Sequence, residues 1–409
     1  MNNRPSLKAI LFGLSFMSCG NALVNIIVPL KAQLLGFATY EISWVASFYY
    51  LGYLVGCIYT PHLVKRVGHI RAFILVATVI SSATLSYSQT EVSYYWMLLR
   101  TIAGFCIATI YMIAESWVND LAGEHNRARI IGRYRVVDLS AVVIGQTLVG
   151  SVSLNTAEGL IIANIIMSLG VLPLAITTSR EPSNIGETKF AVRKMFKRNR
   201  VAALSSVVFG MSWGAFSGIG PVFAKHFNLT NQMVGYFVAS AIVGGILFQM
   251  LVGTVADKID NEKIIAILAA CAGACALVLW HGDLKAVEMI VLTSLWGGFA
   301  TPIYSLSIAI ANRLKGDSDF LEVSGSLLFI YGMGAIIGPK IAGFLVEVFE
   351  MRFLFLFIGL ALLSLIVFIP ILRLLEHRTR PVLAGPKYIP TPVRSPAIYE
   401  IDPRRKKNK

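Results

Sequence analysis

The sequence has 409 residues, of which 56% are hydrophobic and only 14% are charged. Soluble proteins carry about 25% charged residues, and this much apolar surface exceeds what one globular core can hide. The composition therefore excludes an ordinary soluble domain and predicts an all-α polytopic membrane protein.

The formal charge of +14 is concentrated in two segments. Residues 179–200 contain seven Lys or Arg and two Glu, and residues 379–409 contain eight Lys or Arg with Glu400 and Asp402. Basic residues beside apolar runs are typical of cytoplasmic loops and tails. We therefore expect a lipid bilayer around this protein and no nucleic-acid partner.

Twelve apolar runs are long enough to cross a hydrocarbon core of ~30 Å, which takes about twenty residues each. The Lys/Arg bias places both termini in the cytoplasm. We expect an N-terminal six-helix half over 1–178, a basic cytoplasmic loop over 179–200, a C-terminal half over 201–376 and a disordered, basic, Pro-rich tail over 377–409. The expected spans cover residues 8–34, 40–63, 69–88, 92–119, 129–153, 157–178, 201–226, 230–255, 262–281, 285–312, 320–346 and 351–374.

The two halves repeat in sequence. Ile144 and Gly145 match Ile337 and Gly338 at an offset of 193 residues, and further matches at nearly this offset are spread over five helix pairs. Because six is an even number, both copies insert with the same orientation, which predicts two parallel six-helix repeats.

A polar stripe runs along the fourth span. Its members recur every three or four residues on about one quarter of a helix circumference: Arg100, Gly104, Ala108, Tyr111, Glu115 and Asn119. A charged residue that faced lipid would cost several kcal/mol, so the stripe faces protein or water. Arg100 and Glu115 lie ~22 Å apart along the helix and cannot pair directly. We expect Arg100 to bind backbone carbonyls of a neighbouring helix or an acidic group of a cargo.

The fifth span adds Asp138 and Gln146. Glu115 and Asp138 are the expected proton carriers, because burial favours the neutral form of a carboxyl group whereas a nearby arginine favours the ionised form. Arg133 and Arg135 lie near enough along the chain to pair with either acid. The alternative is a fixed ion pair that ties the fourth span to the fifth.

Further cavity-lining candidates lie on other spans. Ser18, Asn21 and Asn25 form a polar stripe on the first span, where each amide needs a hydrogen-bond partner. They either line a solute path or bind a neighbouring helix. Tyr304, beside Pro302, and the aromatic residues of the second span either stack on a planar cargo or serve packing.

These features together resemble the major facilitator superfamily. Its loop signature appears after the eighth span as Gly253, Asp257 and Lys258, and the first half keeps part of it, with Lys65 at the usual Asp position. The resemblance implies a cytoplasmic gate whose charge contacts break when the halves rock; positive-inside anchoring is the alternative. The gating candidates are Lys65, Arg66, Gly68, Arg71, Gly253, Asp257 and Lys258.

A narrower pattern resembles the YcaD-like bacterial subfamily of this superfamily. It consists of Ala114-Glu115-Ser116-Trp117 in the first half and Thr301-Pro302-Ile303-Tyr304 in the second. Some carriers of similar type are linked to vitamin uptake, riboflavin among them, but the narrower resemblance adds little about the cargo.

No phosphate-binding loop, hydrolase motif or metal-ligand spacing occurs in the sequence, so we expect no enzyme activity and no cofactor. The expected protein is a monomeric, proton-coupled secondary transporter of a small organic solute in a bacterial inner membrane. Gln146 stands where drug antiporters commonly carry Pro, which favours uptake of a vitamin-like metabolite. The alternatives are a multidrug or metabolite efflux antiporter and a non-transporting membrane sensor.

Overall fold

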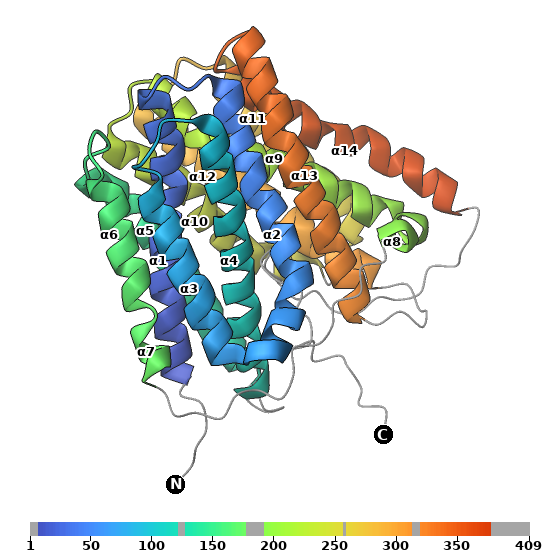
Figure 1. Ribbon diagram of the computed structural model, residues 1–409. Helices are drawn as coiled ribbons and strands as arrows, with labels where there is room; N and C mark the ends of the chain where they lie inside the picture. Colours follow the sequence, from blue (N-terminus) through green and yellow to red (C-terminus); the bar gives the residue numbers. More distant parts are fainter. Residues whose placement is uncertain (1–6, 122–126, 177–191, 257–258, 313–319, 378–409) are drawn as a thin grey trace, which may run out of the picture. The chain divides into compact units, whose positions relative to one another are not determined.

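The computed structural model describes residues 7–121, 127–176, 192–256, 259–312 and 320–377, which form fourteen α-helices and one short 3-10 helix, with no strand among them (Figure 1). The helices are α1 (Leu7–Leu34), α2 (Thr39–Val67), α3 (His69–Ser86), α4 (Ser93–Leu121), α5 (Arg127–Thr147), η1 (Leu148–Ser151), α6 (Glu158–Leu169), α7 (Leu172–Ala175), α8 (Val192–Arg198), α9 (Arg200–His226), α10 (Asn231–Ala256), α11 (Asn261–His281), α12 (Ala286–Ala311), α13 (Phe320–Val348) and α14 (Phe353–His377). The predicted tail beyond His377, and the first part of the predicted basic loop up to residue 191, lie outside the described residues.

Most of these helices have the length and composition of membrane spans. Within the described residues, eleven segments are long and apolar enough to cross a bilayer, with α6 and α7 counted together. The helix α5 lies where the fifth span was expected, but its 21 residues include four arginines and Asp138. The all-α membrane class predicted from composition is confirmed.

The fifth and sixth spans depart most from the sequence prediction. The fifth span was expected to reach residue 153, but α5 ends at Thr147 and a 3-10 turn follows. The sixth was expected to be continuous, but it breaks at Gly170 and resumes in α7, whose first turn contains Pro173. Proline lacks a backbone N–H and is tolerated in a first helical turn, which explains where the helix restarts. Neither the end of α5 at Thr147 nor the break at Gly170 can be recognised from the hydropathy of the sequence alone.

The chain forms two compact units. Among the described residues, 7–35 and 48–176 form unit 1, and 36–47 and 192–377 form unit 2. The helix α2 is continuous across this division, and its first nine residues, Thr39–Ser47, group with unit 2.

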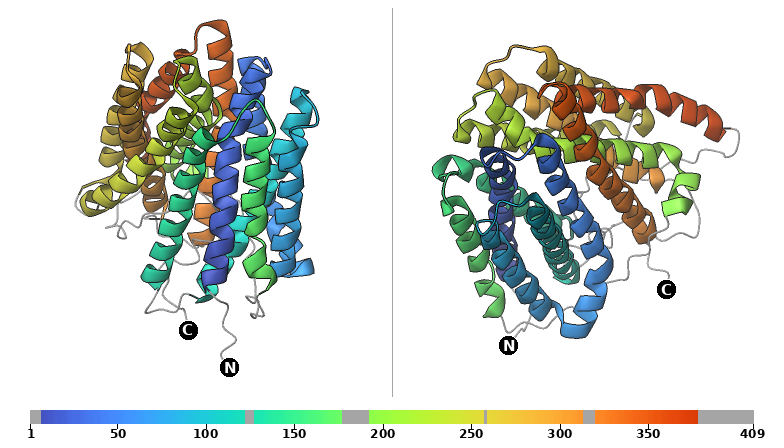
Figure 2. Two further views of the ribbon diagram at one scale, coloured as in Figure 1. Left: turned by 90° about the vertical axis from the view of Figure 1, so that its left-hand side faces the viewer. Right: turned by 45° about the horizontal axis from the view of Figure 1, so that its top comes forward.

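Glycine contacts hold the helices of unit 1 together. In Figure 2, α1 runs between α5 and α6, with which it packs. A Cβ atom at Gly145 of α5 would overlap the carbonyl oxygen of Cys19 in α1. A Cβ at Gly52 of α2 would likewise overlap the backbone of Thr101 in α4. Small residues permit this close backbone approach, which membrane helices use in place of a hydrophobic driving force.

Unit 2 repeats these crossings with its own glycines. A Cβ at Gly338 of α13 would overlap the carbonyl oxygen of Met211 in α9, and one at Gly244 of α10 would overlap the carbonyl of Ser294 in α12. Gly338 is the residue that the 193-residue offset aligns with Gly145. The sequence repeat is therefore also a repeat of helix contacts, as two parallel six-helix copies require.

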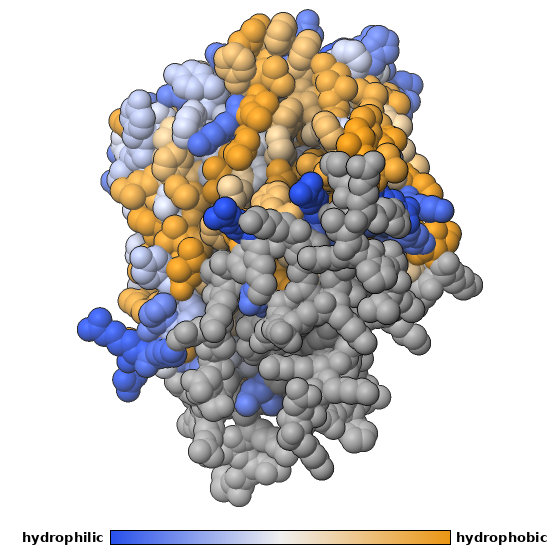
Figure 3. Space-filling model, turned by 90° about the vertical axis from the view of Figure 1, so that its right-hand side faces the viewer, coloured by the Kyte–Doolittle hydropathy of each residue, from blue (hydrophilic) through white to orange (hydrophobic). Residues whose placement is uncertain are grey.

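The outer surfaces of the described helices expose apolar side chains. Leu360, Val367 and Leu374, spaced by seven residues on α14, are 55%, 59% and 72% exposed. Figure 3 shows broad apolar areas on one face of the molecule, with hydrophilic residues gathered at their margins. In water such a surface would be unfavourable, whereas in a bilayer it meets lipid chains.

Candidate functional site

A buried carboxylate lies at the centre of a three-helix polar cluster in unit 1. The Ser18 hydroxyl of α1 donates a hydrogen bond to Asp138 Oδ1 of α5 at 2.7 Å. The Tyr111 hydroxyl of α4 donates to the same oxygen at 3.2 Å, and the two hydroxyl oxygens are 3.1 Å apart. Asp138 is 1% exposed. The cluster therefore joins residues of the two predicted stripes, on the first and fourth spans, to Asp138 of the fifth, with two hydroxyl donors that stabilise its ionised form.

The second acid, Glu115, is fully buried one helical turn further along α4. Its Oε1 accepts a hydrogen bond from the Tyr134 hydroxyl of α5 at 3.0 Å. Tyr134 precedes Asp138 by four residues, so both side chains lie on the same face of α5. The two acids are thus arranged along one α4–α5 contact, each bound by a tyrosine hydroxyl.

The two arginines near these acids differ in how exposed they are to solvent. Arg133 is exposed, whereas Arg135 is half-buried and lies close enough to Asp138 to interact with it electrostatically. Sequence reasoning proposed both arginines as partners and missed Tyr134. The spacing of four residues between Tyr134 and Asp138 is the signal that could have found it.

A second cluster surrounds Arg100. Its Nη1 donates a hydrogen bond to Asn25 Oδ1 of α1 at 2.8 Å, and its guanidinium lies 4.8 Å from the centre of the Tyr49 ring of α2. Asn21 Nδ2 donates to the Tyr49 hydroxyl at 3.3 Å. The described partner of Arg100 is therefore an amide side chain with an aromatic ring, where the sequence led us to expect a backbone carbonyl or an acidic cargo.

The Arg100 cluster combines a cation with adaptable polar groups. Arg100 and Asn21 are 4% and 7% exposed, while Asn25 and Tyr49 are half-buried. A guanidinium over a tyrosine ring is attracted by about 0.5–2 kcal/mol, depending on how far water is excluded. Such a cluster can hold an anionic or a planar polar group.

Other predicted path residues fall outside the two clusters. Gln146 of α5 is 8% exposed, and its Oε1 has no hydrogen-bond partner among the described residues. The side chain of Asn119 lies outside the description. Tyr304 is fully buried in unit 2, where its ring packs 6.3 Å from Phe209 and 5.5 Å from Tyr331. The structure therefore brings Ser18, Asn21, Asn25, Arg100, Tyr111, Glu115 and Asp138 together in unit 1 and places Tyr304 in a separate aromatic core.

The predicted gating residues are only partly described. Lys65 and Arg66 at the end of α2 and Arg71 in α3 are exposed, and Gly253 in α10 is half-buried. Gly68 joins α2 to α3 with a φ of 84°, a left-handed conformation that favours glycine. Asp257 and Lys258 lie outside the described residues. The first-half signature is thus a tight helix–helix turn with exposed basic side chains.

No group of histidine, cysteine and carboxylate side chains suited to a metal ion occurs in the part of the chain that the structure describes. The two clusters offer proton acceptors and polar contacts. This chemistry suits reversible binding and proton transfer.

Known proteins are similar to this chain in sequence over most of its length. The family model described as Major Facilitator Superfamily matches residues 10–284 and 202–401. The "Uncharacterized MFS-type transporter YcaD" of Salmonella arizonae is 26% identical over 387 residues, which cover 93% of this chain and 98% of that protein. The protein of the same name from Salmonella typhi has the same identity and coverage. The resemblance inferred from sequence motifs is confirmed.

Solved transporter structures share the fold. The nucleoside transporter NupG superposes with a TM-score of 0.75 at 15% identity, covering 90% of this chain and 99% of its own. A bacterial homologue of the human lysosomal transporter Spinster, in an inward-facing and occupied conformation, gives a TM-score of 0.71 at 13% identity over 91% and 96% of the two chains.

Proposed function

We propose, from the premise that this chain belongs to the major facilitator superfamily of membrane transporters, that it couples the entry of a small organic solute to the entry of protons. The solute is a vitamin-like metabolite of the riboflavin type. The protein acts as a monomer in the bacterial inner membrane with both termini in the cytoplasm, and its two halves rock to alternate access.

The Asp138 cluster carries the proposal of proton coupling. A carboxyl group buried beside two hydroxyl donors is stabilised as an anion by hydrogen bonds and as a neutral acid by desolvation. Small rearrangements of Ser18 or Tyr111 then change which form is favoured. Because α1, α4 and α5 each contribute one group, any relative movement of these helices changes the affinity of Asp138 for a proton.

Glu115 supplies a second proton carrier. Its hydrogen bond from Tyr134 lies on the same α4–α5 contact as the Asp138 cluster. Buried ionisable residues in membrane spans are rare and are most often part of a substrate or proton path.

The Arg100 cluster supports the proposal for the solute. Asn25 and Tyr49 are accessible in part, so a solute can replace the Asn25 amide on Arg100 or stack beside the Tyr49 ring. A planar solute with acceptor atoms satisfies both contacts, which fits a riboflavin-like molecule. Uptake is preferred over efflux because Gln146 replaces the proline of antiporter-type motifs.

The first experiment screens vitamins, siderophores and cationic drugs for thermal stabilisation of the purified protein at mildly acidic and neutral pH. A ligand at about 100 times its dissociation constant stabilises the folded state by ~2.7 kcal/mol. We expect a vitamin-like hit with a different affinity at the two pH values. Hits confined to cationic drugs would overturn the uptake proposal in favour of efflux.

The second experiment measures accumulation of that solute in proteoliposomes under an imposed pH gradient. For one proton per neutral solute, each pH unit supports about tenfold accumulation. We expect Glu115→Gln and Asp138→Asn to abolish accumulation but to retain solute exchange at equal pH. Unchanged accumulation in both variants would contradict the coupling assignment.

A further inference from the structure

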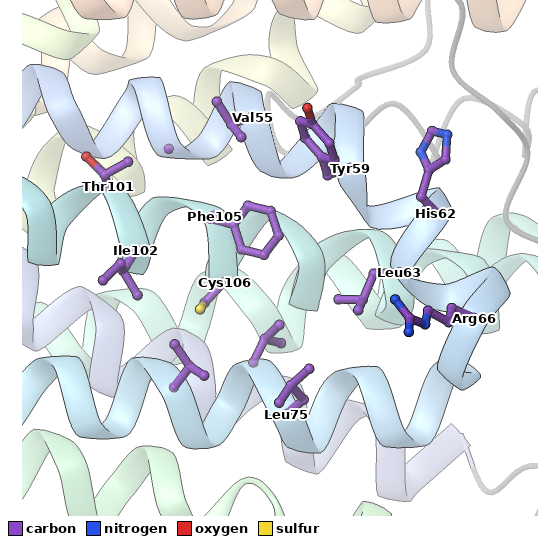
Figure 4. A pocket seen from close by; sticks show the side chains of 13 residues that line it. Val55, Tyr59, His62, Leu63, Arg66, Leu75, Thr101, Ile102, Phe105 and Cys106 are labelled. Atoms are coloured by element: carbon purple, nitrogen blue, oxygen red, sulfur yellow. The ribbon is translucent and has the colours of Figure 1, made fainter.

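An apolar groove lies between α2, α3 and α4, on a part of unit 1 separate from both polar clusters. It encloses about 650 Å³. Figure 4 shows Val55 and Tyr59 of α2 along one side, Leu75 of α3 along the other, and Ile102 and Phe105 of α4 at the base. None of the predicted path residues lines this groove.

The groove opens to the outside of the helices. Tyr59, Leu75 and Val79 line it and are 59%, 49% and 40% exposed. Such apolar side chains on membrane-spanning helices face lipid chains. The natural occupant therefore comes from the bilayer.

One end of the groove is basic. His62 and Arg66 lie one helical turn apart at the end of α2, both are exposed, and both line the groove. Figure 4 shows the Arg66 side chain reaching over this end of the groove, near Leu63. Among the described residues, none of the ion pairs engages either side chain. The basic end thus has the chemistry to receive an anion.

The length of the groove matches one leaflet. Its lining along α2 runs from Gly52 to Arg66, which spans ~21 Å at 1.5 Å per residue. One leaflet is about 20–22 Å thick when its headgroup region is included, of which about 15 Å is hydrocarbon. An acyl chain in the groove therefore brings its headgroup to the level of Arg66.

We propose that this groove binds one acyl chain of an anionic phospholipid from the surrounding bilayer, with the lipid phosphate held by Arg66 and His62. Apolar walls bind the chain without regard to headgroup, whereas Arg66 makes the site selective for negative charge. The Lys/Arg bias of the loops places this lipid in the cytoplasmic leaflet. The site is independent of the proposed solute path.

The test uses the purified full-length protein with phosphatidylglycerol or phosphatidylcholine that carries a photoreactive group on one acyl chain. After irradiation, labelled peptides are identified by mass spectrometry. We expect phosphatidylglycerol to label the groove-lining segments of α2, α3 and α4 more strongly than phosphatidylcholine does. One basic residue near an anionic headgroup is worth about a fivefold preference.

Two variants and one control separate the parts of the proposal. Arg66→Gln is expected to remove the preference of about fivefold while some labelling by both lipids remains. Val79→Trp, at a 40% exposed position on the groove wall, is expected to block labelling by both lipids. Lys263→Gln, a change of an exposed basic residue in α11 of unit 2, should alter neither.

Several results would overturn the proposal. Equal labelling by the two lipids in the wild-type protein would contradict an anionic site. Full labelling of Val79→Trp, or labelling spread evenly over the helices, would contradict binding in this groove. Equal loss of preference in Arg66→Gln and Lys263→Gln would show a diffuse charge effect. None of these results depends on transport, so they leave the proposed function untouched.

Discussion

Gly145→Ala is the substitution that most directly links helix packing to the Asp138 cluster. The added Cβ would lie well inside 3.0 Å of the Cys19 carbonyl oxygen, a separation that real Cβ atoms essentially never show. Because the obstacle is backbone, α1 and α5 must separate by more than about 1 Å to reach ordinary contact. Overpacking of this kind lowers the unfolding free energy by about 1–3 kcal/mol.

The same displacement acts on the proton site. Cys19 follows Ser18, whose 2.7 Å hydrogen bond to Asp138 can lengthen by only about 0.8 Å before it exceeds 3.5 Å and is lost. We therefore expect Gly145→Ala to fold with reduced thermal stability and to lose most gradient-driven accumulation. Both quantities are measured on the purified protein, by a melting curve and by uptake in proteoliposomes.

Gly132→Ala provides a matched control on the same helix. A Cβ at Gly132 would meet nothing within 4 Å. Alanine favours a helix over glycine by about 0.8–1.0 kcal/mol, so this variant should be as stable as the wild-type protein or more so, and fully active. Wild-type stability and accumulation in Gly145→Ala would refute the reasoning.

Three further outcomes are expected. Arg100→Lys keeps the charge but loses the planar guanidinium over Tyr49, so solute affinity should fall about fivefold to thirtyfold in a titration; an unchanged dissociation constant would show that Arg100 is only structural. Arg373→Ala removes partly exposed ion pairs with Asp260 at 2.8 Å and with Glu262 at 3.5 Å, and should change stability by less than about 1 kcal/mol in a thermal melt; a larger loss would mean that these pairs are coupled to wider packing. Deletion of residues 379–409 should leave transport intact in proteoliposomes, because the tail lies outside the predicted spans; loss of transport would contradict a tail that transport does not need.

The membrane fold could be predicted because it depends on local properties of the chain. Apolar run length, loop charge and internal repeats gave the helix order and the pairing of Gly145 with Gly338. The boundary errors occur where backbone geometry departs from a regular helix without a change in hydropathy, after Thr147 and at Gly170. Periodicity detects the face of a helix better than it detects where the helix ends.

The sequence indicated which residues belong to the candidate site, but only some of the contacts between them could be predicted. Spacing along α4 correctly indicated that Arg100, Tyr111 and Glu115 are buried. The Ser18–Asp138 hydrogen bond joins residues 120 positions apart, and it depends on the register of α1 against α5. The lipid groove was not visible in the sequence at all, because it is formed where three helices fail to fill the space between them.

Solute-driven proton entry is the measurement that tests the central claim most directly. Proteoliposomes containing a pH-sensitive dye would receive the solute identified by thermal stabilisation, with no imposed gradient. We predict that solute entry acidifies the interior of wild-type vesicles, and that Asp138→Asn vesicles admit the solute without acidification. Solute entry into wild-type vesicles with no change in internal pH would contradict proton coupling.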